Sequence, residues 1–288
     1  MKPLAVLASS RFTAESSLDR ARLGLGLSWY LGAWPHRLSR ACRAGDRSRV
    51  HTLERRWARQ VAKYLDVRFD VAGMEHVDPH RRTVIVALHE GFADTVALLH
   101  LGLDLRFVAR DELLEWPTLG RYLRESGQIL VDTDAPRSAY RTMVRQGSAS
   151  LDAGESVVVF PQGSILGIET AFMPGAFRMA QRLDAWILPV VVTGSHLVWE
   201  YPYTPLIRFG QRISMRILPP VAPDEAVANA HDLESAMKRA ALQPGMAPAR
   251  RFHPEIDGYW DGYRYEIDPA FPEVAELVAA HRRTVAPV

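Results

Sequence analysis

The sequence has almost no cysteine, no long apolar run and little net charge. Cys42 is the single cysteine in 288 residues, which excludes an intramolecular disulfide and a cysteine-ligated metal centre. No apolar run approaches the roughly 20 residues that a membrane-spanning helix requires. The formal net charge of +2 is too small to indicate a nucleic-acid-binding protein. We therefore expect no nucleic-acid partner and no membrane-spanning segment.

The middle of the chain alternates between apolar strands and helices. Hydrophobic residues make up 48% and charged residues 24%, which is ordinary for a globular protein. Pro189 lies inside one apolar run and favours an edge strand or a strand start there. We predict an α/β fold with a mixed, largely parallel sheet, flanked by helices and preceded by an N-terminal amphipathic helical segment. The expected strands lie at 64–71, 84–88, 105–109, 127–132, 156–160, 186–192 and 212–218.

The two ends of the chain differ in character from its middle. Residues 23–34 are apolar and include Trp29, Tyr30 and Trp34, and eight arginines follow between residues 37 and 59. This pattern predicts peripheral attachment to an anionic membrane surface, and the alternative is a helical hairpin packed on the domain with a solvated arginine face. The aromatic tail is expected to pack on the domain. We divide the chain into a membrane-associating segment (1–60), a central domain (61–250) and the tail (251–288).

His89 stands where the central apolar strand 84–88 ends, and a helix follows it near Asp94. Ligands of open α/β sheets bind at such carboxyl ends of strands. A turn at Gly91 can bring the two side chains together, so that Asp94 orients the imidazole while its other nitrogen takes a proton from a hydroxyl. The structural alternative is a capping or buried histidine. His89-Glu90 begins like a zinc-protease helix, but Ala93 replaces the second histidine, so no metal is implied.

Two more polar loops follow strands further along the chain. The order and the residues of the three loops resemble the motifs of the glycerolipid acyltransferase family. The resemblance covers about residues 70–220, and the family includes the bacterial 1-acyl-glycerol-3-phosphate acyltransferases. The matching motifs are His89 and Asp94 (H-x4-D), then Arg110-Asp111-Glu112-Leu113 with Pro117, Gly120 and Gly127–Thr133, then Phe160-Pro161-Gln162-Gly163-Ser164-Ile165, and last Ile187-Leu188-Pro189-Val190.

The resemblance implies a reaction and a role for each motif. His89, held by Asp94, would act as the catalytic base that lets an acceptor hydroxyl attack the thioester of a fatty acyl-CoA or acyl carrier protein. The acceptor would be a membrane lysophospholipid, with 1-acyl-glycerol-3-phosphate expected first and phosphatidate as its product. No cofactor is implied beyond the thioester co-substrate, and the enzyme would lie on the cytoplasmic face of the membrane. Residues implied in acceptor binding are Arg110, Phe160, Pro161, Gln162, Gly163 and Ser164.

Three positions depart from the family's motifs and keep alternatives open. Gln162 replaces a glutamate, and Thr133 and Ile165 replace arginines that the family uses near the acceptor phosphate. These departures admit an acceptor without a phosphate or with a larger headgroup, or a family member that binds lipid without catalysis. A hydrolase with Ser164 as nucleophile is a third possibility, but the G-x-S-x-G pattern that it requires is missing.

Overall fold

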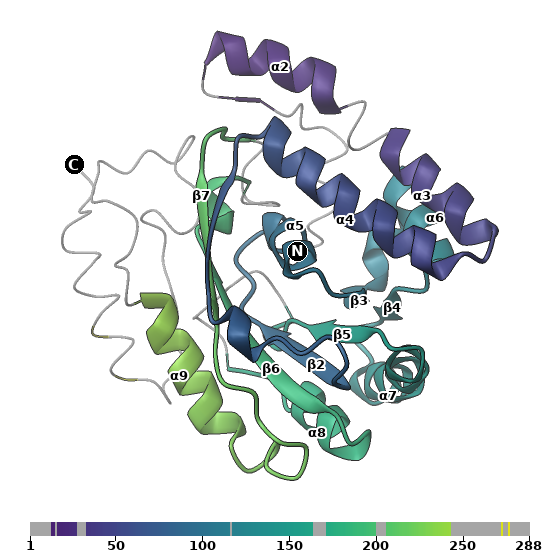
Figure 1. Cartoon of the computed structure of the whole chain (residues 1–288), viewed down its shortest axis with the longest axis vertical. Coiled ribbons are helices and arrows are strands. Elements are labelled where there is room, and N and C mark those ends of the chain that lie inside the picture. Colours follow the sequence, from purple (N-terminus) through teal and green to yellow (C-terminus); the bar gives the residue numbers. More distant parts are fainter. Residues whose placement is uncertain are drawn as a thin grey trace.

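The computed structural model describes residues 13–14, 16–27, 33–115, 117–163, 171–199 and 206–242, together with residues 272 and 276. Its centre is a seven-stranded sheet in the order β1-β7-β6-β2-β5-β3-β4, with helices on both faces (Figure 1). Neighbouring strands are parallel except for the antiparallel β6–β7 pair. The predicted α/β fold with a mixed, largely parallel sheet is therefore confirmed. The strands are β1 Arg68–Ala72, β2 Thr83–Ala87, β3 Leu105–Arg110, β4 Ile129–Val131, β5 Ser156–Val159, β6 Trp186–Thr193 and β7 Arg212–Ile217.

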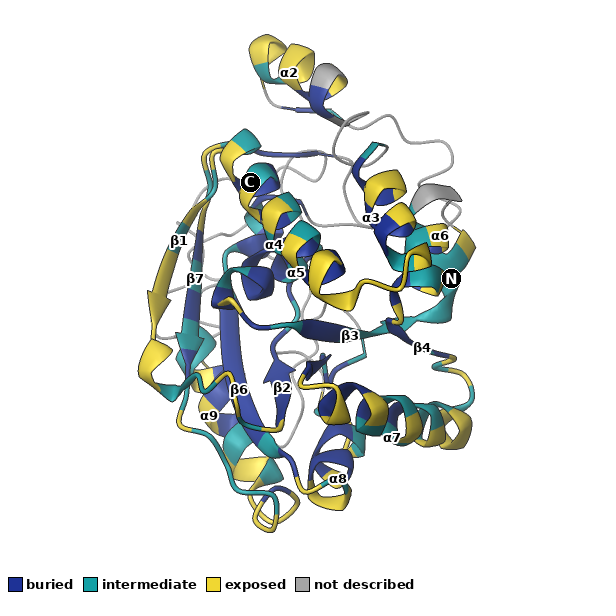
Figure 2. Ribbon diagram, turned by 45° about the vertical axis from the view of Figure 1, so that its right-hand side comes forward, coloured by how far each residue is buried: buried dark blue, intermediate teal, exposed yellow. Residues whose placement is uncertain are grey.

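The helices cover both faces of the sheet because successive residues of each strand point to opposite sides. In β2, Ile85 and Ala87 pack in a core with α4 and α5, whereas Val84 and Val86 pack with α7, α8 and α9. Figure 2 shows the buried central strands β2 and β6 between helices whose outer faces are exposed, and β1 exposed at the side of the sheet. The helices are α2 Ser17–Leu27, α3 Trp34–Arg43, α4 Arg47–Tyr64, α5 Ala93–Leu98, α6 Pro117–Ser126, α7 Pro136–Asp152, α8 Gly175–Arg182 and α9 Ala230–Leu242, with short 3₁₀ turns η2 Met74–His76, η3 Leu99–Leu101, η4 Asp111–Glu115 and η5 Ser195–Leu197.

Two local predictions about strands are wrong. Residues 64–67 are not strand, because α4 continues to Tyr64 and Asp66 then turns the backbone with a positive φ of 53°. Pro189 lies in β6, which is an interior strand between β7 and β2 rather than an edge. Proline has no backbone N–H to donate, and the β6–β7 ladder begins only at the next residue, Val190, so Pro189 lies just outside that ladder. The Pro189 carbonyl accepts a hydrogen bond from the N–H of Leu218.

The N-terminal helices α3 and α4 pack against the domain with their arginines outward. Leu38 and Ala41 of α3 and Val50 and Ala58 of α4 are buried, and most arginines of this segment are exposed. Within the described ranges, no helix combines the length and the apolarity needed to cross a bilayer. Trp29, Tyr30 and the aromatic tail lie outside the described residues, so the roles expected for both ends stay predictions.

Candidate active site

The turn that follows β2 brings His89 and Asp94 into contact. β2 is buried along its whole length, and His89 emerges at its carboxyl end with a side chain that is 20% exposed. Asp94 lies in the first turn of α5 and is fully buried. The Nδ1 atom of His89 lies 2.7 Å from Oδ2 of Asp94. The residue spacing indicated that this turn could join the two side chains, and the structure shows that it does.

Asp94 also holds the backbone of the turn in place. Its Oδ2 atom accepts hydrogen bonds from the N–H groups of Glu90 at 2.8 Å and Gly91 at 3.1 Å. Three hydrogen-bond donors thus converge on one carboxylate oxygen. An ionised Asp94 places the proton of neutral His89 on Nδ1 and leaves Nε2 as an acceptor. Nε2 has no hydrogen-bond partner in the part of the chain that the structure describes.

The ring of His89 is held from one side by Phe160. The two rings are stacked, with centroids 4.0 Å apart and an interplanar angle of 20°. Phe160 follows β5, the strand beside β2, so the third motif meets the first motif at one edge of the sheet. The sequence analysis implied only a role for Phe160 in acceptor binding. The structure places it directly against the imidazole.

Pro161, Gln162 and Gly163 form a tight turn beside Phe160, in which the N–H of Gly163 donates to the Phe160 carbonyl at 3.1 Å. Pro161 and Gln162 are buried, and the Pro161 carbonyl accepts from the N–H of Met173 at 2.9 Å. Gly163 has a φ of 70°, and a Cβ at this position would lie 2.5 Å from Cε of Met173. A side chain is therefore disfavoured at Gly163 by its backbone conformation, whereas the exposed end of Met173 could move aside. Ser164 and Ile165 lie outside the described residues.

Arg110 ends β3, at the same edge of the sheet and two strands away from β2. Its side chain is 39% exposed and pairs with Glu112 at 2.9 Å. Its Nε atom is buried and has no hydrogen-bond partner among the residues described. Thr133 follows β4 at this edge and is half-buried. The structure thus puts Arg110 and the first and third motifs on one rim of the sheet, the rim where α/β proteins bind ligands.

Sequence reasoning missed the residues that anchor the His89 turn from behind. Glu90 is buried, and its Oε2 atom accepts from the N–H of Gly194 at 2.8 Å and lies 3.0 Å from Nδ1 of His196. Burial raises the pKa of Glu90, and the neighbouring His196 partly offsets that rise. A Cβ on Gly91 would meet the Trp199 carbonyl at 3.0 Å. No short motif links Glu90 to residues more than 100 positions away, so the sequence held no signal for this contact.

An apolar pocket lies behind the same turn. Phe92, Ala93 and Val96 from the start of α5 line it together with Trp199 and Ile207, and Leu23 of α2 and Trp57 of α4 close its far side. Its volume of about 70 Å³ is small. No set of three histidine, cysteine or acidic side chains in the described ranges is arranged to hold a metal ion.

Comparisons with known proteins agree with the motifs. A family model described as "Acyltransferase" matches residues 68–193, which span β1 to the end of β6. A 1-acyl-sn-glycerol-3-phosphate acyltransferase of Limnanthes alba is 24% identical over 165 residues, covering 55% of this chain and 56% of that protein. The Pseudomonas aeruginosa protein of the same name is 29% identical over 126 residues, covering 43% and 49%. A lyso-ornithine lipid O-acyltransferase of Rhizobium meliloti is 28% identical over 130 residues, covering 43% of each chain.

The chain thus spans about half the length of the curated relatives it matches. Among solved structures, the 1-acyl-sn-glycerophosphate (LPA) acyltransferase PlsC from Thermotoga maritima superposes with a TM-score of 0.61 at 18% identity. That match covers 85% of this chain and 96% of the other. At this identity the superposition establishes a shared fold.

Proposed function

We propose that this chain is a member of the glycerolipid acyltransferase family and moves a fatty acyl group from a thioester to the hydroxyl of a lysophospholipid-type acceptor. The observation that carries the proposal is the pairing of His89 with buried Asp94 at 2.7 Å, which leaves Nε2 without a hydrogen-bond partner among the described residues. An oriented imidazole with one free nitrogen is what a general base for a hydroxyl requires.

The proposed reaction needs no covalent acyl-enzyme. Nε2 of His89 takes the proton of the acceptor hydroxyl as its oxygen attacks the thioester carbonyl. The C–S bond then breaks, and the departing thiolate takes the proton from the imidazolium. Asp94 stabilises the imidazolium between these two transfers, and Phe160 offers it the face of an aromatic ring at 4.0 Å. The Gly163 N–H donates to the Phe160 carbonyl at 3.1 Å, so the proposed donor to the oxyanion from this motif is the amide of Ser164.

The preferred acceptor is 1-acyl-glycerol-3-phosphate, with phosphatidate as the product. Two of the relatives described above carry this activity in their names, and Arg110 offers a guanidinium at the same rim as His89. The donor is a fatty acyl-CoA or an acyl carrier protein, and the small apolar pocket at Phe92 is in place to hold part of an acyl chain. We assign no cofactor beyond this co-substrate.

A different acceptor is the second candidate, favoured by residues that differ from the family pattern. Thr133 and Gln162 carry no charge, so this rim holds less positive charge and one carboxylate fewer than the motifs prescribe. A larger-headgroup or phosphate-free lipid acceptor fits such a rim, and the lyso-ornithine lipid relative acts on a lipid of another kind.

An acceptor panel distinguishes these candidates. Purified protein would be mixed with palmitoyl-CoA, and in parallel with palmitoyl carrier protein, and offered lysophosphatidate, other lysophospholipids, lyso-ornithine lipid or no acceptor. Phosphatidate formed from lysophosphatidate supports the first candidate, and product from another acceptor alone supports the second.

A non-catalytic, lipid-binding role is the remaining alternative. It would show as lipid binding without product for any donor or acceptor, together with turnover gained in Gln162→Glu. Turnover by the wild-type chain would exclude it.

We further propose that the N-terminal segment holds the enzyme on the cytoplasmic face of an anionic membrane. The arginines of α3 and α4 are largely exposed, and Leu18 of α2 is 71% exposed. Basic and apolar side chains together favour an anionic lipid surface. Co-sedimentation with anionic vesicles, lost when the salt concentration rises and absent with neutral vesicles, is the expected result. Equal binding to both kinds of vesicle would contradict this placement.

A further inference from the structure

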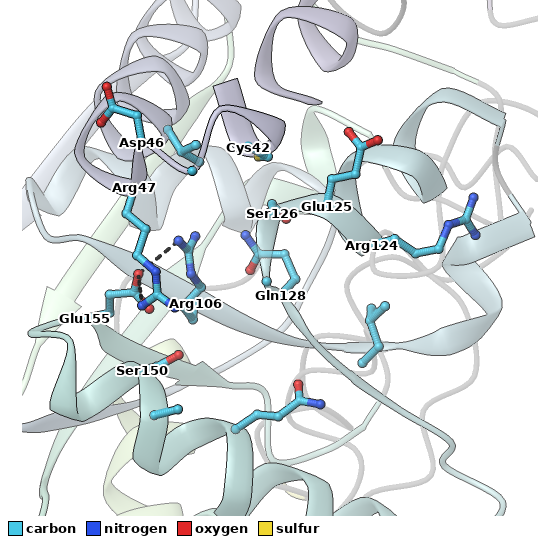
Figure 3. Close-up of a pocket in the computed structure, with 16 residues that line it drawn as sticks. Cys42, Asp46, Arg47, Arg106, Arg124, Glu125, Ser126, Gln128, Ser150 and Glu155 are labelled. Atoms are coloured by element: carbon cyan, nitrogen blue, oxygen red, sulfur yellow. Dashed lines mark ion pairs between the residues drawn. The ribbon is translucent and has the colours of Figure 1, made fainter. Parts of the chain in front are cut away.

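A second, larger cavity lies at the amino ends of β3, β4 and β5, whereas His89 follows the carboxyl end of β2. Figure 3 shows the side chains that line this cavity. Its volume is about 550 Å³, within the range of small-molecule sites. Arg106 near the start of β3, Gln128 just before β4 and Glu155 just before β5 line its floor. The amino end of α4 and the carboxyl ends of α6 and α7 form its walls. The proposed reaction uses none of these residues.

The floor of this cavity is a network of buried charges. Glu155 Oε1 accepts from Nη2 of Arg106 at 2.9 Å and lies 3.0 Å from Nε2 of His51. Arg47, from the rim, approaches the same oxygen at 3.7 Å. Arg106 and Glu155 are only 3% and 4% exposed. Burying two ions is costly because both lose their hydration. The attraction between them offsets this cost only if further hydrogen bonds also satisfy their remaining polar atoms.

Three polar atoms of the cavity lining lack such partners. Nη1 of Arg106, Oε2 of Glu155 and Oε2 of Glu125 are buried without a hydrogen-bond partner among the described residues, although Nη1 of Arg106 lies 3.7 Å from Oε1 of Glu54. One is a cationic donor and two are anionic acceptors. Buried polar atoms in proteins are normally hydrogen-bonded. A bound ligand that supplies the complementary groups would explain why these three atoms lack partners.

The ionised side chains around the cavity are balanced in sign. Arg47, Arg106 and Arg124 line it, and so do Asp46, Glu125 and Glu155. Three charges of each sign disfavour a simple anion or a simple cation. They match a molecule that is neutral overall and carries both charges.

We propose that this cavity binds a small zwitterion with a primary ammonium group and a phosphate or carboxylate group. The ammonium donates to Oε2 of Glu125 and Glu155. The anionic group accepts from Nη1 of Arg106 and lies near the amino end of α4, where the helix dipole favours negative charge. The volume also accommodates such a group as the headgroup of a lipid.

Titration calorimetry of the full chain with O-phosphoethanolamine and with β-alanine tests the proposal. We expect saturable one-site binding of at least one of them, at least tenfold tighter than that of ethanolamine or inorganic phosphate. The proposal is overturned if neither zwitterion binds saturably, or if ethanolamine or inorganic phosphate binds as tightly as the zwitterions.

Cys42 supplies a second readout, because it lines the cavity and is the single cysteine. Burial, followed by the charge of Glu54, raises the pKa of its thiol to about 11, so alkylation is slow and is best followed at high pH. Ligand binding is expected to slow that alkylation severalfold. An unchanged rate at saturating ligand contradicts binding in this cavity.

Variants locate the site. Glu125→Gln and Glu155→Gln each remove an acceptor charge and are expected to weaken binding at least tenfold, whereas Glu75→Gln, at an exposed position in η2, leaves it unchanged. Glu125 is 23% exposed, so its variant remains informative if Glu155→Gln does not fold. Unweakened binding in folded Glu125→Gln overturns the assignment. Competition by phosphatidylethanolamine vesicles identifies a lipid headgroup as the source, and its absence identifies a free molecule.

Discussion

Oδ2 of Asp94 lies 2.7 Å from Nδ1 of His89, and the same oxygen receives the N–H groups of Glu90 and Gly91. The carboxylate therefore fixes both the imidazole and the turn that carries it. Its other oxygen, Oδ1, is buried without a hydrogen-bond partner among the described residues. All of its polar interactions thus converge on the proposed base and its backbone.

Asp94→Asn is expected to lower kcat about 10²- to 10⁴-fold, the usual contribution of a positioned acid or base. The amide oxygen can still accept from one backbone N–H, but the negative charge that stabilises the imidazolium is lost. Steady-state kinetics of thioester consumption measure the effect. The matched control is Asp70→Asn on β1, whose side chain is 66% exposed. Equal kcat values for the two variants would refute a catalytic role for Asp94.

Phe160→Ala is expected to lower kcat about two- to tenfold, because a stacked aromatic pair contributes roughly 0.5–1.5 kcal/mol. The ring would no longer fix the plane of the imidazole or stabilise its charged form, so the acidic limb of the pH profile of kcat/KM should also move. Phe160→Tyr retains the ring and is expected to restore both. If Phe160→Ala raised only the KM of the acceptor, the residue would contact the acceptor and not position the base.

Arg110→Ala is expected to raise the KM for lysophosphatidate about tenfold or more and to leave kcat nearly unchanged. A hydrogen bond to a charged group contributes about 1.5–3 kcal/mol, and the Nε atom of Arg110 has no partner in the described part of the chain. The control is a monoacylglycerol acceptor, whose KM should not respond because it carries no phosphate. A parallel rise for both acceptors would mean that Arg110 does not bind the phosphate.

The His51 cluster makes stability depend on pH. Burial lowers the pKa of His51, but the hydrogen bonds to Glu155 and Glu54 outweigh it and raise the pKa above 6.5. The native state then holds a proton that the unfolded chain has released, so this contribution is complete below pH 6.5 and is lost as the pH rises through the raised value.

Urea unfolding at a series of pH values tests this coupling. The difference in the free energy of unfolding between wild type and His51→Gln should shrink as the pH rises through that window. Burial raises the pKa of Glu155, but His51 and Arg106 outweigh it and hold the pKa below 4.5, so this carboxyl changes stability only at more acidic pH than the window tested. A difference that does not vary with pH would show that His51 does not hold the extra proton.

Local patterns predicted most of the sheet and the meeting of His89 with Asp94. The β-branched run before His89 is a buried strand because both faces of a parallel sheet are covered by helices. The turn could be foreseen because Gly91 allows the backbone to turn tightly between the apolar strand before His89 and the helix expected near Asp94. The motif order then placed Phe160 and Arg110 at the same rim.

Contacts between distant residues were beyond such patterns. Glu90 meets His196, and His51 meets Glu155, across more than 100 residues of sequence in each case. Either contact depends on the order of strands in the sheet, which periodicity does not encode. Pro189 was misplaced for the same reason, because its tolerance inside β6 depends on where the neighbouring ladder begins.

The most direct test of the account is release of free thiol from palmitoyl-CoA or palmitoyl carrier protein by wild type and by His89→Ala, with lysophosphatidate or another lysolipid as acceptor. The account predicts acceptor-dependent release by wild type, and release at least about 10²-fold slower in a His89→Ala protein that unfolds at the same urea concentration as wild type. Equal rates for the two proteins would contradict His89 as the base.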